Sequence, residues 1–156
     1  MSIFQFELYV SYSQLCVFSK GMETPFNDWS DRNISQGFSW RSSSVSFMTI
    51  LDEGKCEVKM FVDEPITDLG VDVVRAFRVP FSTSNGGVEI ASISDGVPIE
   101  LSPGSYALQV EFLKTDHETQ YANIRLNKGP GNFEVIRADA GIEPAGELDI
   151  SGAPAI

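Results

Sequence analysis

The feature that most constrains this chain is the alternation of apolar and polar side chains with a period of two residues. In residues 4–10 and again in residues 106–112, every second side chain is apolar and the side chains between them are mostly polar. This pattern is typical of half-buried strands, because successive side chains of a strand point to opposite faces of a sheet. Similar short runs predict about nine or ten strands, at residues 4–10, 15–18, 45–49, 56–62, 73–81, 88–93, 97–101, 106–112, 121–126 and 133–136.

Turn residues separate these runs, as at Asn85-Gly86-Gly87 and Pro103-Gly104. The alternation stops in residues 22–36, where Asn27 or Asp28 could cap a short helix and Gly37 could end it in a left-handed conformation. The turn at residues 52–54, between two strand-like runs, predicts a β-hairpin. We therefore predict an all-β fold, an antiparallel β-sandwich with one short helix.

The chain of 156 residues is long enough for one domain with a sizeable core. Its last 19 residues differ in composition, with four acidic residues and neither lysine nor arginine. We predict a sandwich domain over residues 1–137, followed by an acidic extension rich in Gly, Pro and Ala over residues 138–156. Such a composition favours a mobile or weakly docked end.

The net charge is −11, from 11 basic and 22 acidic residues. Without the extension, 18 acidic residues still face 11 basic ones, which leaves −7 on residues 1–137. Nucleic acids and anionic membrane surfaces attract Lys and Arg, so neither is expected to bind directly. The charge favours a basic protein as the partner, bound by a monomer or a homodimer.

The sequence offers little for catalysis or for metal binding. His117 is the single histidine and lies in a polar turn, while Cys16 and Cys56 lie in apolar, strand-like runs. We predict buried structural thiols, no enzymatic activity and no cofactor; whether the two cysteines pair stays open. The N-terminal residues alternate like a strand and lack the basic start of a signal peptide, and no apolar run approaches ~20 residues, so we expect a cytoplasmic protein.

Residues 52–72 form the most charged segment outside the extension, with seven acidic residues and two lysines. One interpretation is an acidic face for a cationic partner, and another is a pair of solvated loops. A calcium site is a third interpretation, although the usual D-x-D-x-D-G spacing is absent. The candidate binding residues in this segment are Asp52, Glu53, Asp63, Glu64, Asp68 and Asp72.

A second candidate is Asp28-Trp29-Ser30-Asp31, where an indole stands between two carboxylates outside the strand pattern. Trp29 could anchor a protein interface, with Asp28 and Asp31 beside it, or it could tuck the helical segment onto the sandwich. The alternative function is a carbohydrate- or peptide-binding sandwich that uses exposed rings of Trp29, Trp40 or Tyr121.

Several segments, in this order and spacing, make the chain resemble the competence protein J (ComJ) family. They are VSYSQLCVF at 10–18, Pro25, DWSD at 28–31, Ile34, Gly37-Phe38, VSF at 45–47, VPF at 79–81, GVEIASI at 87–93 and LSPGSYAL at 101–108. The resemblance covers residues 8–136 and is strongest in the first forty.

The resemblance implies a cytoplasmic inhibitor of a DNA-entry nuclease, or the immunity partner of a nuclease toxin. It carries over no catalytic residue and no mapped interface. An acidic, rigid surface could occupy the basic groove in which a nuclease binds its polyanionic substrate. We therefore predict a non-catalytic inhibitor that binds a basic DNA nuclease through residues 52–72 and through Asp28, Trp29 and Asp31.

Overall fold

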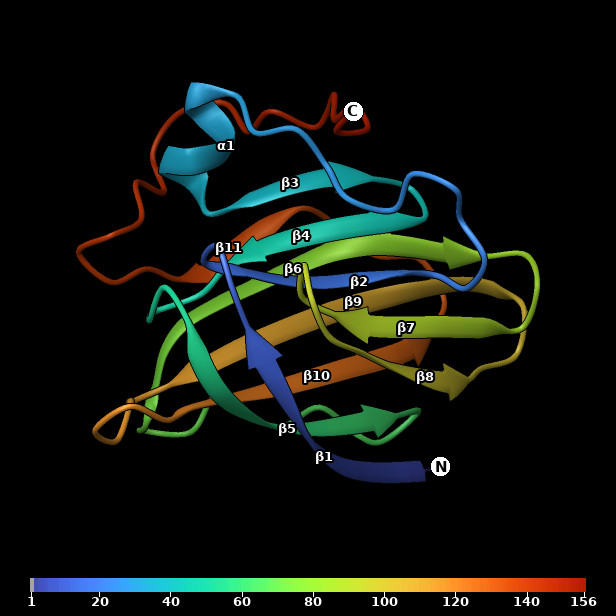
Figure 1. Cartoon of the computed structure of the whole chain (residues 1–156), viewed down its shortest axis with the longest axis horizontal. Coiled ribbons are helices and arrows are strands. Elements are labelled where there is room, and N and C mark those ends of the chain that lie inside the picture. The colour runs from blue at the N-terminus through green and yellow to red at the C-terminus, as the bar shows by residue number, and fades with distance from the viewer. Residues whose placement is uncertain (1) are drawn as a thin grey trace.

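The structure is a computed structural model that describes residues 2–156, and two packed β-sheets make up most of it (Figure 1). Within this range there are eleven strands and one helix. In chain order they are β1 (Ser2–Val10), β2 (Gln14–Ser19), α1 (Asp31–Gln36), β3 (Phe38–Arg41), β4 (Ser44–Met48), β5 (Gly54–Val62), β6 (Val73–Thr83), β7 (Gly87–Ala91), β8 (Gly96–Glu100), β9 (Gly104–Leu113), β10 (Gln120–Lys128) and β11 (Glu134–Arg137).

The predicted β-sandwich is confirmed, with one strand more than the upper end of the expected number. The larger sheet has the strand order β1-β5-β10-β9-β6-β11, and the smaller sheet has the order β3-β4-β2-β7-β8. Neighbouring strands are antiparallel except for β5 and β10, which run parallel from Gln120 beside Cys56 to Leu126 beside Val62. This pair joins the first strands of the larger sheet to its later ones.

The predicted hairpin at residues 52–54 is wrong. β4 and β5 flank this turn, but β4 pairs with β2 and β3 in the smaller sheet, whereas β5 pairs with β1 and β10 in the larger one. The turn therefore carries the chain from one sheet to the other. Both strands alternate apolar and polar side chains because each has one face on the shared core, and this pattern does not name the partner of a strand.

The core lies between the two sheets and is made by the apolar positions of the alternating runs. Phe38 and Phe47 of the smaller sheet contact Phe77 of the larger one, with ring centroids 5.8 and 5.7 Å from the Phe77 centroid. Leu8 and Ile124 are also fully buried. These contacts across the layers hold the sheets together and fix which face of each strand meets solvent.

The helix is shorter than the segment that breaks the strand pattern, and its N-cap is Ser30 rather than Asn27 or Asp28. The Ser30 hydroxyl accepts from the Asn33 amide, and the Asn33 side chain accepts from the Ser30 amide, which makes a capping box. Gly37 ends the helix with φ of 94°, as predicted. A Cβ there would lie 2.5 Å from Ile142 Cδ1, so this position needs glycine for its backbone and for space.

The C-terminal segment, for which the composition favoured a mobile or a weakly docked end, lies docked on the sandwich (Figure 1). Arg32 of α1 donates to the carbonyl oxygens of residues 143, 145 and 147. The Gln36 side chain exchanges two hydrogen bonds with the backbone of Asp149, and Ile142 is buried in the core. The composition of the segment did not predict this docking, because the hydrogen-bonding side chains that hold its backbone belong to Arg32 and Gln36 in α1.

Candidate functional site

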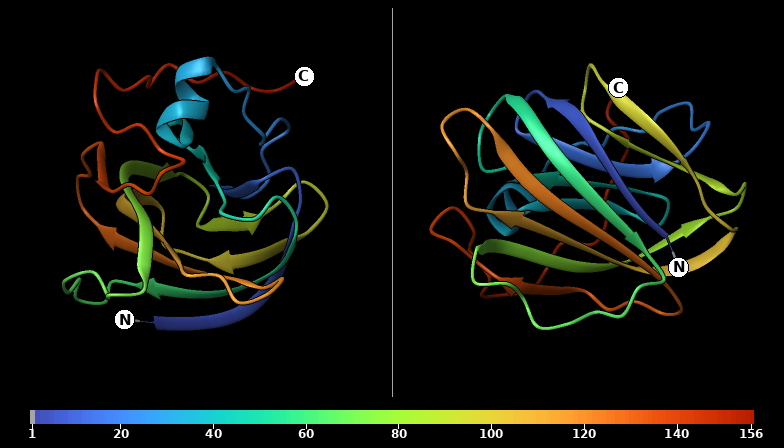
Figure 2. Two further views of the ribbon diagram at one scale, coloured as in Figure 1. Left: turned by 90° about the vertical axis from the view of Figure 1, so that its left-hand side faces the viewer. Right: turned by 90° about the horizontal axis from the view of Figure 1, so that it is seen from below.

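The acidic stretch of residues 52–72 is divided between two ends of the larger sheet. Asp52 and Glu53 precede β5, whereas Asp63 and Glu64 follow it. The nine residues of the strand separate the two pairs by about 30 Å, at ~3.3 Å per residue. Residues 63–72 then lead to the start of β6, which lies back at the first end (Figure 2), and Asp68 is exposed on the way. These neighbours in sequence therefore do not form one surface.

A different set of carboxylates gathers where β5 and β10 begin. The parallel pairing puts the turn of residues 114–119 beside Asp52 and Glu53, and a shallow hollow there is lined by Asp52, Glu53 and Glu118. Asp72 lies at the same end of the sheet but three strands from β5, where its carbonyl oxygen accepts from the Lys114 amide at 2.9 Å. We call this group the acidic end, and it consists of Asp52, Glu53, Asp72, Asp116 and Glu118.

The acidic end is solvated, since all five of its carboxylate residues are exposed. Lys55 and Lys114 lie among them, so five acidic and two basic residues leave a net charge of −3. His117 is 94% exposed, with its Nε2 atom 3.7 Å from Asp116 Oδ1. The sequence analysis missed Asp116 and Glu118, because only the parallel pairing of β5 with β10 brings them beside Asp52.

At the opposite end of β5, Asp63 is bonded within the fold. Its backbone is left-handed, with φ of 53°, and its Oδ1 atom accepts from the Lys128 amide at 2.8 Å. The carbonyl oxygen of Glu64 accepts from the Asn127 side chain. Both residues are half-buried and fasten the end of β5 to the end of β10. The side chain of Asp63 therefore has a structural role, since it accepts a hydrogen bond from the backbone of a neighbouring strand.

The segment before α1 is the other predicted site. Asp28 and Asp31 are exposed, and Trp29 between them is half-buried. The Trp29 Nε1 atom is buried and has no hydrogen-bond partner among residues 2–156. The Ser30 hydroxyl donates to Asp149, and hydrogen bonds from Ser151 and Ser30 lower the pKa of that carboxyl. The segment is thus held by the C-terminal residues while its two carboxylates face solvent.

The aromatic side chains of the alternative prediction do not share a surface. Trp40 lies on β3 of the smaller sheet, donates from Nε1 to the Pro80 carbonyl oxygen and stacks edge-on against Phe133. Tyr121 lies on β10 of the larger sheet, beside Glu57. The half-buried Trp40 is held by these contacts, so the geometry disfavours a platform of stacked rings for a sugar.

The two thiols are buried and separate. Cys16 is on β2 of the smaller sheet, Cys56 is on β5 of the larger one, and both are free. Burial raises the pKa of each thiol to about 12, so both are neutral at physiological pH. Among residues 2–156, no group of three or more His, Cys, Asp or Glu side chains is arranged to hold a metal ion, and no helix is long and apolar enough to cross a membrane.

The outer face of the larger sheet carries a buried charge that sequence reasoning did not single out. Glu111 of β9 is 2% exposed and accepts hydrogen bonds from Gln109, Asn123 and Arg125 at 2.6 to 3.0 Å. Arg78 of β6 in turn donates to Gln109. We call these five side chains the outer-face network, and its carboxylate is fully paired within the chain.

Comparison with known proteins decides the family. The family model described as competence protein J (ComJ) matches residues 7–130, which is most of the chain and includes all strands of the smaller sheet. The chain belongs to the ComJ family. This confirms the resemblance drawn from the sequence segments, and it leaves the docked C-terminal segment outside the matched region.

Relatives within and around the ComJ family agree with this assignment. A DNA-entry nuclease inhibitor of Bacillus subtilis (strain 168) is 30% identical over 107 residues, which cover 65% of this chain and 76% of that protein. The crystal structure of ComJ from Bacillus subtilis, described as an inhibitor of the DNA degrading activity of NucA, superposes with a TM-score of 0.70 at 23% identity, over 80% of this chain and 95% of that one.

A second solved structure shares the fold alone. It is described as crocagin biosynthetic gene J and superposes with a TM-score of 0.56 at 15% identity, over 81% of this chain and 97% of that one. The sandwich of the ComJ family therefore also occurs in a protein with a different description. Function has to be argued from the family and from the surface, rather than from the fold.

Proposed function

We propose that this chain is a non-catalytic inhibitor of a DNA nuclease and that it binds the nuclease as a protein partner. The observation that carries the proposal is membership of the ComJ family, together with a 30% identical relative described as a DNA-entry nuclease inhibitor. The high pKa of the two thiols and the exposure of His117 fit a protein that acts by binding.

The acidic end is the surface that we propose to face the nuclease. A nuclease presents cationic groups to the phosphates of DNA, and carboxylates on a rigid scaffold can pair with the same groups. Asp52, Glu53 and Asp72 project from strand ends that the sheet holds in place, so little conformational entropy is lost on binding. Asp116 and Glu118 extend the predicted set.

The segment with Asp28, Trp29 and Asp31 is proposed as a second contact. Its exposed carboxylates add to the attraction, and the half-buried indole can supply apolar contact. Of the other predicted residues, Asp68 is exposed and can contribute to long-range attraction, while Asp63 and Glu64 are half-buried at the far end of β5. We assign these three the smaller part in binding.

The test is inhibition of DNA cleavage by a purified DNA-entry nuclease. Two nucleases can be used: NucA, which the description of the Bacillus subtilis ComJ structure names, and a nuclease encoded beside this chain. We expect the cleavage of plasmid DNA by at least one of them to fall in proportion to the amount of this chain that is added. The protein alone should neither cleave nor retain the DNA. Full cleavage by both nucleases at a large molar excess of the chain would contradict the proposal.

The second contact can be tested on the same complex. Replacing Trp29 by alanine should raise the dissociation rate by about tenfold or more, as removal of an interface anchor does. Thermal melting would check that the variant folds, and Trp40→Phe would serve as the control, since Trp40 is bonded inside the fold. An unchanged dissociation rate in a folded variant would remove Trp29 from the interface.

A further inference from the structure

The four edge strands of the two sheets are not equally protected against pairing with another strand. β11 has four residues and a register shift at Val135, β3 has four residues and is crossed by the C-terminal segment, and β8 has five residues and contains Pro98. Short length, irregular register, proline and covering chain are the usual means by which proteins block an edge.

β1 has none of these protections over residues 2–8, and only its end, at Tyr9, is covered by another segment of the chain. It pairs in continuous register with β5 over nine residues, from Ser2 beside Val62 to Val10 beside Gly54, and it contains neither proline nor lysine. Its exposed side includes Ile3, whose side chain is 60% exposed. In Figure 2, β1 borders the larger sheet with β5 on one side. A long, regular strand at the open border of a sheet is a template for one more strand.

The backbone groups that face this border can be identified from two hydrogen bonds. The Tyr9 amide donates to Asp95 Oδ2 at 2.8 Å and the Ser11 amide donates to Ser92 Oγ at 2.9 Å, both on residues that follow β7 and lie outside the larger sheet. Alternate residues of an antiparallel strand direct N–H and C=O groups to the same side. The same border is therefore faced by the backbone of Ile3, Gln5 and Glu7.

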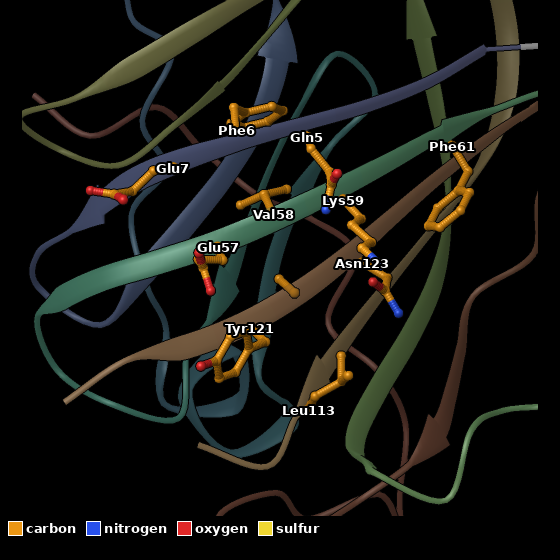
Figure 3. Close-up of a pocket in the computed structure, with 11 residues that line it drawn as sticks. Gln5, Phe6, Glu7, Glu57, Val58, Lys59, Phe61, Leu113, Tyr121 and Asn123 are labelled. Atoms are coloured by element: carbon orange, nitrogen blue, oxygen red, sulfur yellow. The ribbon is translucent and has the colours of Figure 1, made fainter. Parts of the chain in front are cut away.

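The charge beside this border indicates what kind of strand fits. Glu7 stands directly opposite Glu57 on the outer face, and both line a hollow of about 620 Å³ together with Gln5, Lys59 and Tyr121 (Figure 3). Lys55 Nζ is 3.8 Å from Glu7 Oε2, so Glu7 has a cationic partner. Among residues 2–156, Glu57 forms no salt bridge. Like charges directly opposite each other on a sheet repel, and a cation next to them relieves the repulsion.

We propose that β1 is a docking edge for an extended, cationic segment of the nuclease, which joins the larger sheet as a seventh strand. Main-chain hydrogen bonds to Ile3, Gln5 and Glu7 would supply affinity, and a Lys or Arg of the added strand opposite Glu7 would supply specificity. A second copy of this chain fits less well, because each copy brings a net charge of −11 and offers no lysine on β1. This inference rests on the proposed function and adds the edge of β1 to the surface proposed there, since Tyr9 at the end of β1 lines the same hollow as Asp52 and Glu53.

The test is a Gln5→Pro variant of the full chain. Proline removes the Gln5 N–H, which faces the open border, and leaves the hydrogen bonds between β1 and β5 in place. We expect the variant to bind the nuclease about tenfold more weakly, since one lost main-chain hydrogen bond and a disturbed edge are worth about that factor. Gln5→Ala, which keeps the N–H, should bind like the original chain.

Two further measurements keep the test decisive if proline disturbs folding. Glu7→Lys should weaken binding at low salt, whereas Glu100→Lys, an equal change on exposed β8, should not. Hydrogen exchange of the original chain should slow at the amides of Ile3, Gln5 and Glu7 when the nuclease is added. Slower exchange at these amides on self-association would instead assign the edge to a second copy and overturn the proposal.

The outcomes separate this inference from the proposed function. If the original chain inhibits the nuclease while folded Gln5→Pro inhibits equally well and the three amides exchange as before, the docking edge is wrong and the inhibitor stands. If the original chain does not inhibit, the proposed function fails and the docking edge falls with it.

Discussion

The acidic end and the outer-face network both contain carboxylates on the larger sheet, but those of the acidic end are exposed to solvent and that of the network is buried and hydrogen-bonded. Glu111 in the network is 2% exposed and accepts three side-chain hydrogen bonds, whereas Asp52 and Glu53 at the acidic end are exposed. A carboxylate that is paired inside the fold has its charge already neutralised, and one in solvent keeps its field for a partner. The number of carboxylates in a segment therefore does not by itself locate a binding surface.

The sharpest test of this contrast is Glu111→Ala. Removing the carboxylate leaves the half-buried Arg125 guanidinium and the side chains of Gln109 and Asn123 without their acceptor, so we expect the free energy of unfolding to fall by about 3 kcal/mol. The melting temperature should fall by about 6–12 °C for a domain of this size. Inhibition by the folded fraction at low temperature should be unchanged, and a loss of inhibition there would place the network in the interface.

A smaller effect, on binding rather than on stability, is expected at the acidic end. The double variant Asp52→Lys, Glu53→Lys should lower the association rate with the nuclease by about tenfold at low salt. The difference should shrink as salt shortens the Debye length from about 10 Å at 0.1 M to about 3 Å at 1 M. Surface plasmon resonance would measure both rates.

A matched control for that double variant is Glu23→Lys, Glu100→Lys, which changes the net charge equally at exposed positions away from the acidic end. Equal slowing by both double variants would mean that overall charge, rather than the acidic end, attracts the nuclease.

Asp63 allows the same contrast to be drawn inside the acidic stretch. Asp63→Ala should lower the free energy of unfolding by about 1 kcal/mol, because it removes the acceptor for the Lys128 amide and puts alanine at a left-handed position. Asp52→Ala should change it by less than about 0.5 kcal/mol. Urea unfolding would measure both. Asp63→Asn keeps an acceptor and suits the backbone, so it should recover most of the loss; an equally unstable Asn variant would contradict this role.

The smallest effect is expected for the lone histidine. His117 is exposed and has φ of 51°, so His117→Asn suits its backbone and removes the imidazole. Inhibition and stability should both stay the same within error, as measured by DNA cleavage and thermal melting. A folded variant with a large loss of inhibition would bring His117 into the function.

Alternation predicted the strands well, because each strand buries one face and the core imposes the period of two. The glycine at position 37 correctly predicted the end of α1. Its left-handed backbone, and the lack of room for a Cβ there, both require glycine. Which strands pair with each other was not predictable in the same way. The turn at residues 52–54 looks like a hairpin turn whether the next strand returns to the same sheet or crosses to the other.

The candidate site was predicted in part for the same reason. Asp52, Glu53 and Asp72 could be found as members of a charged segment, but their separation from Asp63 and their approach to Asp116 depend on how β5, β6 and β10 pair. The docking of the C-terminal segment was hidden too, because its partners lie more than 100 residues away in the sequence.

The position of β10 also bears on how the chain folds. Residues 2–62 can form the β1–β5 pair early, and residues 73–113 can form the β6–β9 pair, but each leaves an unpaired strand border until residues 120–128 arrive between them. A ribosome makes β10 after β1, β5, β6 and β9, so the larger sheet closes only once β10 is made, through contacts of large sequence separation, which fold slowly. During that interval β5 and β9 are the strand borders most open to pairing with a wrong strand.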